Sequence, residues 1–332
     1  MFHGYDEPLD EDQKELVILY EKLVSESSVP FFDSEQFELI ADFYLQTDQF
    51  EKAREVIGIA LHQYPYSSIF LIQSGHLKIY DNQIDEAIEI AEKIRLIEPF
   101  NSDVYLLFGN AYDAIGQYEE AISYYHQAIE KGAEKDDVYL FIAYSYQNWD
   151  KYSLAVEALK KALIFNKNNT QALGELAFCC DFIEETSEIK SFVKAFIDDN
   201  PYSYMAWYCL GSICCKNEEL DEAIESFDYA VVINEQYLPA QFNLGSIYLI
   251  KDENEKAINC FKSILEINPD DIFALCNMAN AFKNSKNWQV AREYFKKALK
   301  VDASYSDAWH GLGLTYQEMN HHKTAIEFYI GF

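Results

Sequence analysis

Eight alanines recur at a spacing of 34 residues along most of this 332-residue chain. They are Ala53, Ala87, Ala121, Ala155, Ala223, Ala257, Ala291 and Ala325, and Ile189 stands at the one place where the series lacks an alanine. Pro65, Pro99, Pro201 and Pro269 keep the same phase, with successive separations of 34, 102 and 68 residues. A constant period of this length predicts a one-dimensional array of similar units instead of one large core.

Each unit is predicted to be a pair of helices. The segment GNAYDAIGQYEEAISYYHQAIEKG has apolar residues at helical spacing on both sides of Gly116, which separates the two helices. The chain contains only 12 Gly and 7 Pro, too few turn-forming residues for an all-β protein with its frequent turns. The expected fold class is therefore all-α.

The residues resemble the tetratricopeptide repeat, which has a small residue at position 8, Ala at 20 and 27, an aromatic at 24 and Pro at 32. Counted from Ser34, the copies are 34–67, 68–101, 102–135, 136–169, 170–203, 204–237, 238–271, 272–305 and a partial 306–332. Position 8 is always small, as Ala41, Gly75, Gly109, Ala143, Ala177, Gly211, Gly245, Ala279 and Gly313. The resemblance implies a right-handed α-solenoid, a superhelix of helix-turn-helix repeats.

The chain is expected to divide into three regions: an N-terminal segment, a capping helix with a link, and the repeat array. Residues 1–10 are expected to form a flexible acidic N-terminus, and residues 11–33 a capping helix with a link. The repeat array occupies 34–332, and its fifth copy departs from the pattern at Ile189, Val193 and Phe196, where we expect altered packing. The ninth copy stops inside its second helix, so the natural protein is expected to continue past Phe332 or to associate with itself through this end.

The charge of the chain limits its partners. Asp and Glu outnumber Lys and Arg 56 to 26, which gives a formal net charge of −30. Nucleic acids and anionic membranes are poor partners for such a chain, since both require clustered basic residues. No apolar stretch is long enough to span a bilayer and the start lacks the features of a secretory signal, so a cytoplasmic location is expected.

No sequence pattern for catalysis or for a cofactor is found. A Gly-rich phosphate loop, a GxSxG elbow, an HExxH motif and an EF-hand loop are all lacking. Seven cysteines lie between Cys179 and Cys276, but no CxxC pair occurs, and Cys180 and Cys214 fall on a core position of the repeat. The sequence therefore predicts a protein that is not an enzyme and that needs no metal or cofactor.

In proteins of this resemblance, positions 2, 5, 9, 12 and 13 of each copy line a concave groove that binds peptides. Carrying these positions over gives the candidate groove residues Glu35, Glu38, Asp42, His76, Tyr80, Asp103, Asn110, Asp113, Asp137, Tyr144, Phe178, Asp181, Tyr208, Phe242 and Asn280. In copies one to five the charged groove residues are all acidic, whereas copies six to nine have acids and bases in balance. Tyr208 and Phe242, both at position 5, are the best candidates to anchor a ligand.

The predicted function is a non-catalytic scaffold or adaptor whose groove binds a protein segment with basic residues and apolar anchors. An acidic protein carries acids on every surface, so the acidic groove could also reflect composition alone. Asn110, Asn280 and Lys283 do not form the cluster of bases that a terminal carboxylate would need, which disfavours that kind of ligand. The alternative function is the repeat arm of a larger enzyme, such as a glycosyltransferase.

Overall fold

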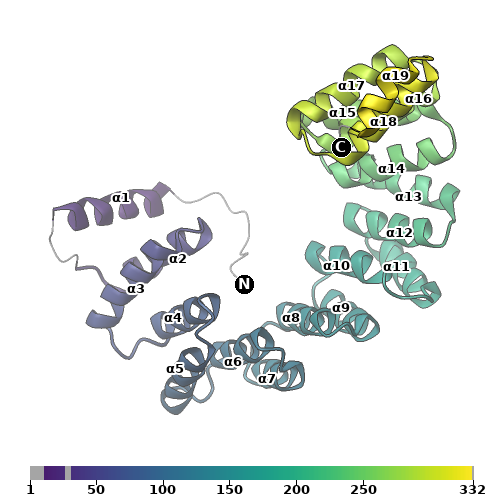
Figure 1. The fold of residues 1–332 in the computed structure, drawn as a ribbon. Coiled ribbons are helices and arrows are strands. Elements are labelled where there is room, and N and C mark those ends of the chain that lie inside the picture. The colour runs from purple at the N-terminus through teal and green to yellow at the C-terminus, as the bar shows by residue number, and fades with distance from the viewer. Residues whose placement is uncertain (1–10, 27–30, 331–332) are drawn as a thin grey trace. The chain divides into compact units, whose positions relative to one another are not determined.

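The computed structural model describes residues 11–26 and 31–330, and every regular element in these residues is a helix, nineteen in all (Figure 1). The expected flexible segment 1–10 and Phe332 lie outside the described residues. The chain divides into two compact units, which meet in the sequence at Asn166 and Lys167, within the fourth copy. Each unit is described by itself below.

Unit 1 contains nine helices. They are α1 (Glu11–Ser25), α2 (Ser34–Gln46), α3 (Phe50–Gln63), α4 (Ser68–Tyr80), α5 (Ile84–Ile97), α6 (Ser102–Ala114), α7 (Tyr118–Glu130), α8 (Lys135–Asn148) and α9 (Tyr152–Phe165). Each helix from α1 to α9 packs against the next one along the chain, and α4 also packs against α6. The unit is thus a stack of antiparallel helix pairs.

Unit 2 contains the other ten helices. They are α10 (Thr170–Cys180), α11 (Ser187–Asp199), α12 (Tyr204–Lys216), α13 (Leu220–Ile233), α14 (Leu238–Ile250), α15 (Asn254–Ile267), α16 (Ile272–Asn284), α17 (Trp288–Val301), α18 (Ser306–Glu318) and α19 (His322–Ile330). From α11 to α19 each helix packs against the next, and contacts also join α14 to α16 and α16 to α18. All-α stacking of helix pairs, an α-solenoid, is the fold predicted from the repeat. We call the even-numbered helices α2 to α18 first helices, because each begins a copy.

A left-handed residue joins the two helices in eight of the nine copies. These residues stand at position 15 and have φ between 56° and 75°: Asp48, Asn82, Gly116, Asp150, Glu218, Asp252, Lys286 and Asn320. Only glycine adopts this conformation without a steric penalty, so seven of the eight turns carry a backbone cost that packing of the two helices must outweigh. Gly116 alone was a visible turn signal in the sequence.

The two helices of a pair approach most closely where a glycine at position 8 of the first helix meets an aromatic ring at position 24 of the second. A methyl group added to Gly245 would lie 2.7 Å from Cζ of Phe261, and one added to Gly211 would lie 2.7 Å from Cδ1 of Phe227. Real carbon contacts are longer than this, so the ring occupies the space that a larger residue would need. Both Phe227 and Phe261 are fully buried.

The fifth copy packs differently from the others, as its unusual residues predicted. Its first helix, α10, ends at Cys180, and six residues separate it from α11, without a left-handed residue among them. The main neighbour of α10 is α12 of the next copy and not its own partner α11. The buried Thr186 in this longer turn donates a hydrogen bond of 2.8 Å to Oδ1 of Asn217, which attaches the turn to the following copy.

Among the described residues, we find no helix with the length and apolar character that a membrane span requires.

Enlarging the small residue at position 20 should destabilise the array. Ala257 is fully buried in α15, so Ala257→Leu forces extra carbon atoms into a filled space and should lower the free energy of unfolding by about 1–3 kcal/mol. Urea unfolding followed by circular dichroism measures this loss. Ala114→Leu, at the exposed end of α6, is the matched control, and an equal stability of the two variants would contradict the close packing.

Candidate functional site

Unit 2 contains a hollow of about 440 Å³ on its first-helix side. Its walls come from α12, α14, α15 and the start of α16, and its lining residues are Tyr208, Leu238, Pro239, Phe242, Asn243, Ile264, Asp271 and Phe273. The volume lies in the range typical of ligand pockets, which are mostly apolar and carry a few polar groups. We call this hollow the aromatic pocket.

The repeat period explains why three rings line this pocket. Tyr208 and Phe242 lie 34 residues apart on successive first helices, and each is fixed from behind by a core ring. The Tyr208 ring centroid lies 5.6 Å from that of Phe227, and the Phe242 centroid lies 5.9 Å from that of Phe261. Phe273, at position 2 of the next copy, is 55% exposed and makes an edge contact with Tyr305. The rings are therefore held by the fold, and a ligand would meet a rigid wall.

Few polar groups face the aromatic pocket. Burial raises the pKa of the Tyr208 hydroxyl, although hydrogen bonds involving Ser212 and Asn243 act in the other direction. Asp271 is the N-cap of α16, and its Oδ1 accepts a hydrogen bond of 2.8 Å from the backbone N–H of Ala274. Asn243 and the second oxygen of Asp271 are thus the groups with capacity left for a ligand.

Sequence reasoning named Tyr208 and Phe242 as anchors but did not include Leu238, Asn243, Ile264 and Asp271. Two of these, Leu238 and Asn243, lie at positions 1 and 6, beside the positions that were carried over. Ile264 stands at position 27, where most copies have alanine. A large residue at a place reserved for a small one was the signal that could have pointed to this wall of the pocket.

In unit 1 the first helices carry the predicted acidic residues, but not all of them are free to meet a partner. Glu35, Asp103 and Asp137 are exposed and Glu38 is half-buried. Oδ1 of Asp42, on α2, accepts a hydrogen bond of 2.8 Å from Nε2 of Gln73 on α4. Such a bond joins two successive copies, which gives this acid a structural role.

Asp113 on α6 has the same structural role two copies later. Its Oδ2 accepts a hydrogen bond of 3.2 Å from Nδ2 of Asn148, and its Oδ1 accepts one from the hydroxyl of Ser145, both on α8. Burial raises the pKa of Asp113, and the two hydrogen bonds oppose this effect. The position rule could not anticipate these partners, because they come from the neighbouring copy.

Two more of the predicted groove residues in unit 1 are partly or fully withdrawn from solvent, His76 being half-buried and Asn110 buried. Asn110 is only 8% exposed, and its Oδ1 accepts a hydrogen bond of 2.7 Å from the hydroxyl of Tyr125. Burial lowers the pKa of His76 to about 4, so this imidazole is neutral at physiological pH. Tyr144 is half-buried, whereas Tyr80 is 58% exposed with its ring 4.4 Å from that of Phe50.

The other predicted residues of unit 2 do not line the aromatic pocket. Phe178 is 48% exposed and contacts the ring of Phe182 at 5.0 Å. Asp181 is exposed, and its backbone oxygen accepts a hydrogen bond of 2.7 Å from Nζ of Lys216. Oδ1 of Asn280 accepts one of 2.9 Å from Nζ of Lys283. Of the fifteen residues, Tyr208 and Phe242 are the two that line this hollow, which is formed by described residues.

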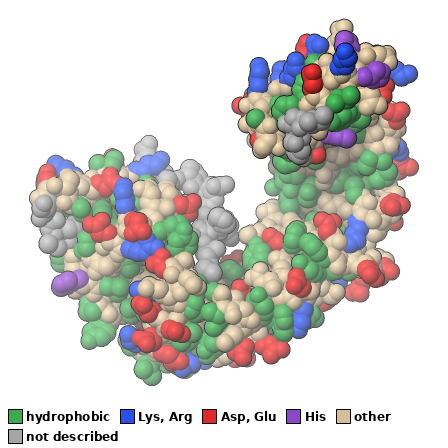
Figure 2. All heavy atoms as spheres, viewed as in Figure 1, with side chains coloured by type: hydrophobic (Ala, Val, Ile, Leu, Met, Phe, Trp, Pro, Cys, Tyr) green, Lys and Arg blue, Asp and Glu red, His purple; other side chains and the backbone are tan. Residues whose placement is uncertain are grey.

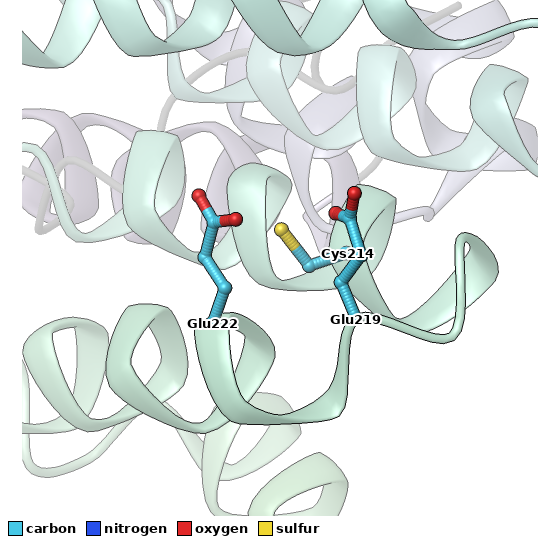
Figure 3. A group of neighbouring side chains, drawn as sticks. All are labelled: Cys214, Glu219 and Glu222. Atoms are coloured by element: carbon cyan, nitrogen blue, oxygen red, sulfur yellow. The ribbon is translucent and has the colours of Figure 1, made fainter.

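One group of side chains in unit 2 has the composition of a metal site. Cys214, Glu219 and Glu222 place potential ligand atoms within 4.8 Å of one another (Figure 3). The carboxylates already hold ammonium groups, since Nζ of Lys190 lies 2.8 Å from Oε2 of Glu222 and also contacts Glu219. Hydrogen bonds from Lys190 and Lys194 lower the pKa of Glu222, while burial raises the pKa of the Cys214 thiol to about 12. In the structure the two acids and the two lysines thus form an ion-pair network beside the Cys214 thiol.

Burial raises the pKa of four more thiols in this part of the chain. The values are about 11 for Cys215 and Cys260 and about 12 for Cys276, and Cys209 is raised further. Protonated thiols are poor nucleophiles and poor metal ligands at neutral pH. These cysteines therefore serve as small apolar residues of the packing.

The raised pKa of Asp42 predicts that the stability of the protein depends on pH. Burial, and then the charge of Glu38, raise the pKa of Asp42 from 3.8 to about 6. The folded state therefore binds this proton more tightly than the unfolded state, and ionisation as the pH rises through this interval costs stability. Asp42→Asn, which keeps the acceptor for Gln73, should be more stable than the natural protein at about pH 7, and the gain should vanish towards about pH 4.

Thermal unfolding followed by circular dichroism across this pH range measures the difference. Glu35→Gln, which removes an exposed acid from the same helix, is the control. A gain that stays constant with pH, or one that the control shares, would show that Asp42 is not the group concerned.

Comparison with known proteins agrees with this geometry. The family model described as tetratricopeptide repeat matches residues 102–130, 136–169, 238–271, 274–305 and 306–330. A curated relative, the BBSome complex member BBS4 homolog of Drosophila melanogaster, is 24% identical over 200 residues, which are 59% of this chain and 40% of the relative. The chain thus matches less than half of that relative's length.

Two solved structures are similar at low identity. The APC/C hetero-tetramer Cut9-Hcn1 gives a TM-score of 0.49 at 15% identity, covering 92% of this chain and 59% of that chain. MamA 41-end from Desulfovibrio magneticus RS-1 gives 0.42 at 16% identity, covering 60% of this chain and 93% of that chain. The constant 34-residue period, the stacked helix pairs and the matches of the family model lead to one assignment. The chain contains tetratricopeptide repeats, which the family model matches at five places between residues 102 and 330.

Proposed function

We propose that this protein is a non-catalytic scaffold that binds segments of other proteins on its first-helix faces. The observation that carries the proposal is the aromatic pocket, where Tyr208, Phe242 and Phe273 line one hollow of about 440 Å³. Partly exposed aromatic side chains on a rigid wall are the usual centres of binding energy in protein interfaces. The pocket suits an apolar side chain of the partner.

The few polar groups of the pocket support a peptide as the ligand. Asn243 can donate and accept hydrogen bonds, and the backbone of a bound segment offers both kinds of partner. Asp271 adds one negative charge at the start of α16, so a basic or neutral segment fits better than an acidic one. A small molecule would meet the same wall, but it would use little of the first-helix surface beyond the pocket.

The first-helix face of unit 1 supports binding of a basic segment. Glu35, Glu38, Asp103 and Asp137 lie on this face with at least partial exposure. A surface with one sign of charge attracts the opposite sign and increases the association rate, and the effect falls as salt rises. Asp42 and Asp113 contribute negative charge from their half-buried places without being released from their hydrogen bonds.

The relative's name supports a role in assembly. A Drosophila melanogaster protein that matches 59% of this chain is named as a member of a complex, the BBSome. A protein whose surface is built from repeated helix pairs offers extended contact areas to several partners. We therefore place the present protein among scaffold components, without assigning it to that complex.

A charge placed at the mouth of the aromatic pocket should block binding. Phe273→Glu puts a carboxylate among apolar rings, and proteins bound through the pocket should be recovered from an extract of the source cell at about tenfold lower yield. Quantitative mass spectrometry of the retained proteins measures the yield. Ile267→Glu is the matched control, since Ile267 and Phe273 are both 55% exposed and Ile267 does not line the pocket.

One outcome of this experiment would contradict the proposal. If Phe273→Glu and Ile267→Glu retain the same proteins at the same yield as the natural chain, the aromatic pocket is not a binding site.

Reversal of charge on α2 should weaken the binding of a basic peptide. We expect a fluorescent lysine-rich peptide to bind more weakly as salt rises, and Glu35→Lys with Glu38→Lys to lower its affinity about tenfold at low salt. Fluorescence anisotropy gives the affinity. The control is Asp85→Lys with Glu89→Lys, which makes the same change of net charge on exposed positions of the second helix α5. Equal losses in both double variants would mean that total charge, not the first-helix face, attracts the peptide.

A further inference from the structure

Helix α17 in unit 2 carries an unusual concentration of positive charge. Six basic residues and one acidic residue lie between Lys283 and Val301, in a chain whose formal net charge is −30. Arg292, Lys296 and Lys300 are spaced four residues apart, which places them in one row along the helix. Figure 2 shows Lys and Arg side chains gathered over the end of unit 2 that includes α17. We call Arg292, Lys296, Lys297 and Lys300 the basic row.

The basic row lacks acidic partners among the residues that the structure describes. No carboxylate lies within ion-pair distance of its four side chains there, and Nε of Arg292 is buried without a hydrogen-bond partner. Elsewhere in the chain basic residues are commonly paired, as Arg54 is with Asp81 and Lys190 with Glu222. A protein with more than twice as many acids as bases leaves these bases unpaired in one place.

The stability of α17 does not explain the row. Like charges four residues apart on a helix repel each other, so Arg292 with Lys296 and Lys296 with Lys300 weaken the helix. Lys300, in the last turn, is compensated by the negative end of the helix dipole, but the dipole acts only within about one turn and does not reach Arg292. Exposed lysines often serve solubility, but a chain this acidic is already highly charged.

A second hollow adjoins the row. It has a volume of about 350 Å³ and is lined by Pro269, Asp270, Leu275, Lys297, Lys300 and Val301. Its lining mixes polar and apolar surface: Val301 is 44% exposed, whereas Leu275 is only 2% exposed. Nζ of Lys297 lies 4.6 Å from the centroid of the Tyr294 ring, which holds this ammonium group beside α17. A depression that offers exposed apolar surface at Val301 beside two cationic side chains is a combination typical of a recognition surface.

We propose that the exposed face of α17 and its adjoining hollow bind an acidic segment of another protein. Carboxylates of the segment pair with Arg292, Lys296 and Lys300, and an apolar side chain of the segment enters the hollow over Leu275 and Val301. This surface lies on a second helix and does not use the aromatic pocket, so the inference is independent of the function proposed above.

The chemistry of the hollow favours an acidic protein segment over a phosphate chain. A nucleic acid has no aliphatic side chain to place against Val301 in the hollow, whereas a peptide can carry one between its carboxylates. A long polyanion would also meet the acidic surface of the remaining chain. A short peptide avoids this repulsion, because charges beyond about 8 Å are screened at physiological salt.

The test uses a fluorescein-labelled peptide of Asp and Glu residues with one central leucine, added to the full chain at physiological salt. We expect saturable binding by fluorescence anisotropy, about tenfold weaker in the double variant Lys296→Glu, Lys300→Glu. Replacing the central leucine of the peptide by serine should weaken binding to the natural chain as well. The matched control is Lys22→Glu with Lys93→Glu, which reverses two exposed lysines of unit 1 and changes the net charge equally.

Circular dichroism of the variants verifies that both fold. Equal affinity of the natural chain and the α17 variant, or an equal loss in the control, overturns the proposal. Stronger binding of an oligothymidylate than of the peptide, lost in the α17 variant, also overturns it and assigns the surface to phosphate. Salt-sensitive self-association of the natural chain that the α17 variant loses, seen by light scattering without peptide, overturns it in favour of a second copy.

Discussion

The close contact between position 8 of the first helix and position 24 of its partner, made in the third, sixth, seventh and ninth copies, is a main constraint on the geometry of the array. Where position 24 is aromatic, as Phe227 and Phe261 are, position 8 is glycine, and even one methyl group would collide with the ring. In the first and fourth copies, where Ile57 and Leu159 replace the ring, position 8 is alanine. The pair of residues thus conserves the space between helices while its members change, as expected for a close-packed interior.

This rule has an instructive exception in the eighth copy. Phe295 is fully buried at position 24 although position 8 is Ala279, and its ring lies against Gly311 of the following copy. The space for the ring is supplied by the neighbour along the array. Packing between copies can therefore replace packing within a copy, which is why the helix pairs act as a stack and not as separate hairpins.

The period and its phase were sufficient to predict the helix pairs, the buried alanines and the two rings of the aromatic pocket, because these depend on position within a copy. The position rule was insufficient for Asp42, Asp113 and Asn110. The surroundings of Asp42 and Asp113 depend on Gln73 and Asn148 of the neighbouring copy. The surroundings of Asn110 depend on the hydroxyl of Tyr125, a group that phenylalanine at the same position of other copies lacks. The left-handed turn residues were hidden because Glu218 and Lys286 are not turn-forming residues, while aspartate and asparagine, which tolerate this conformation, also occur at many other places in the chain.

Four buried or half-buried thiols of unit 2 have a consequence for how opening of the array can be observed. With pKa values of about 11 to 12 for Cys214, Cys215, Cys260 and Cys276, almost no thiolate forms at neutral pH while the helices stay packed. An alkylating reagent can then react with them mainly during brief excursions in which a helix pair separates from its neighbours. These cysteines lie in three successive copies. The alkylation rate of each cysteine would therefore report how often its own part of the stack opens.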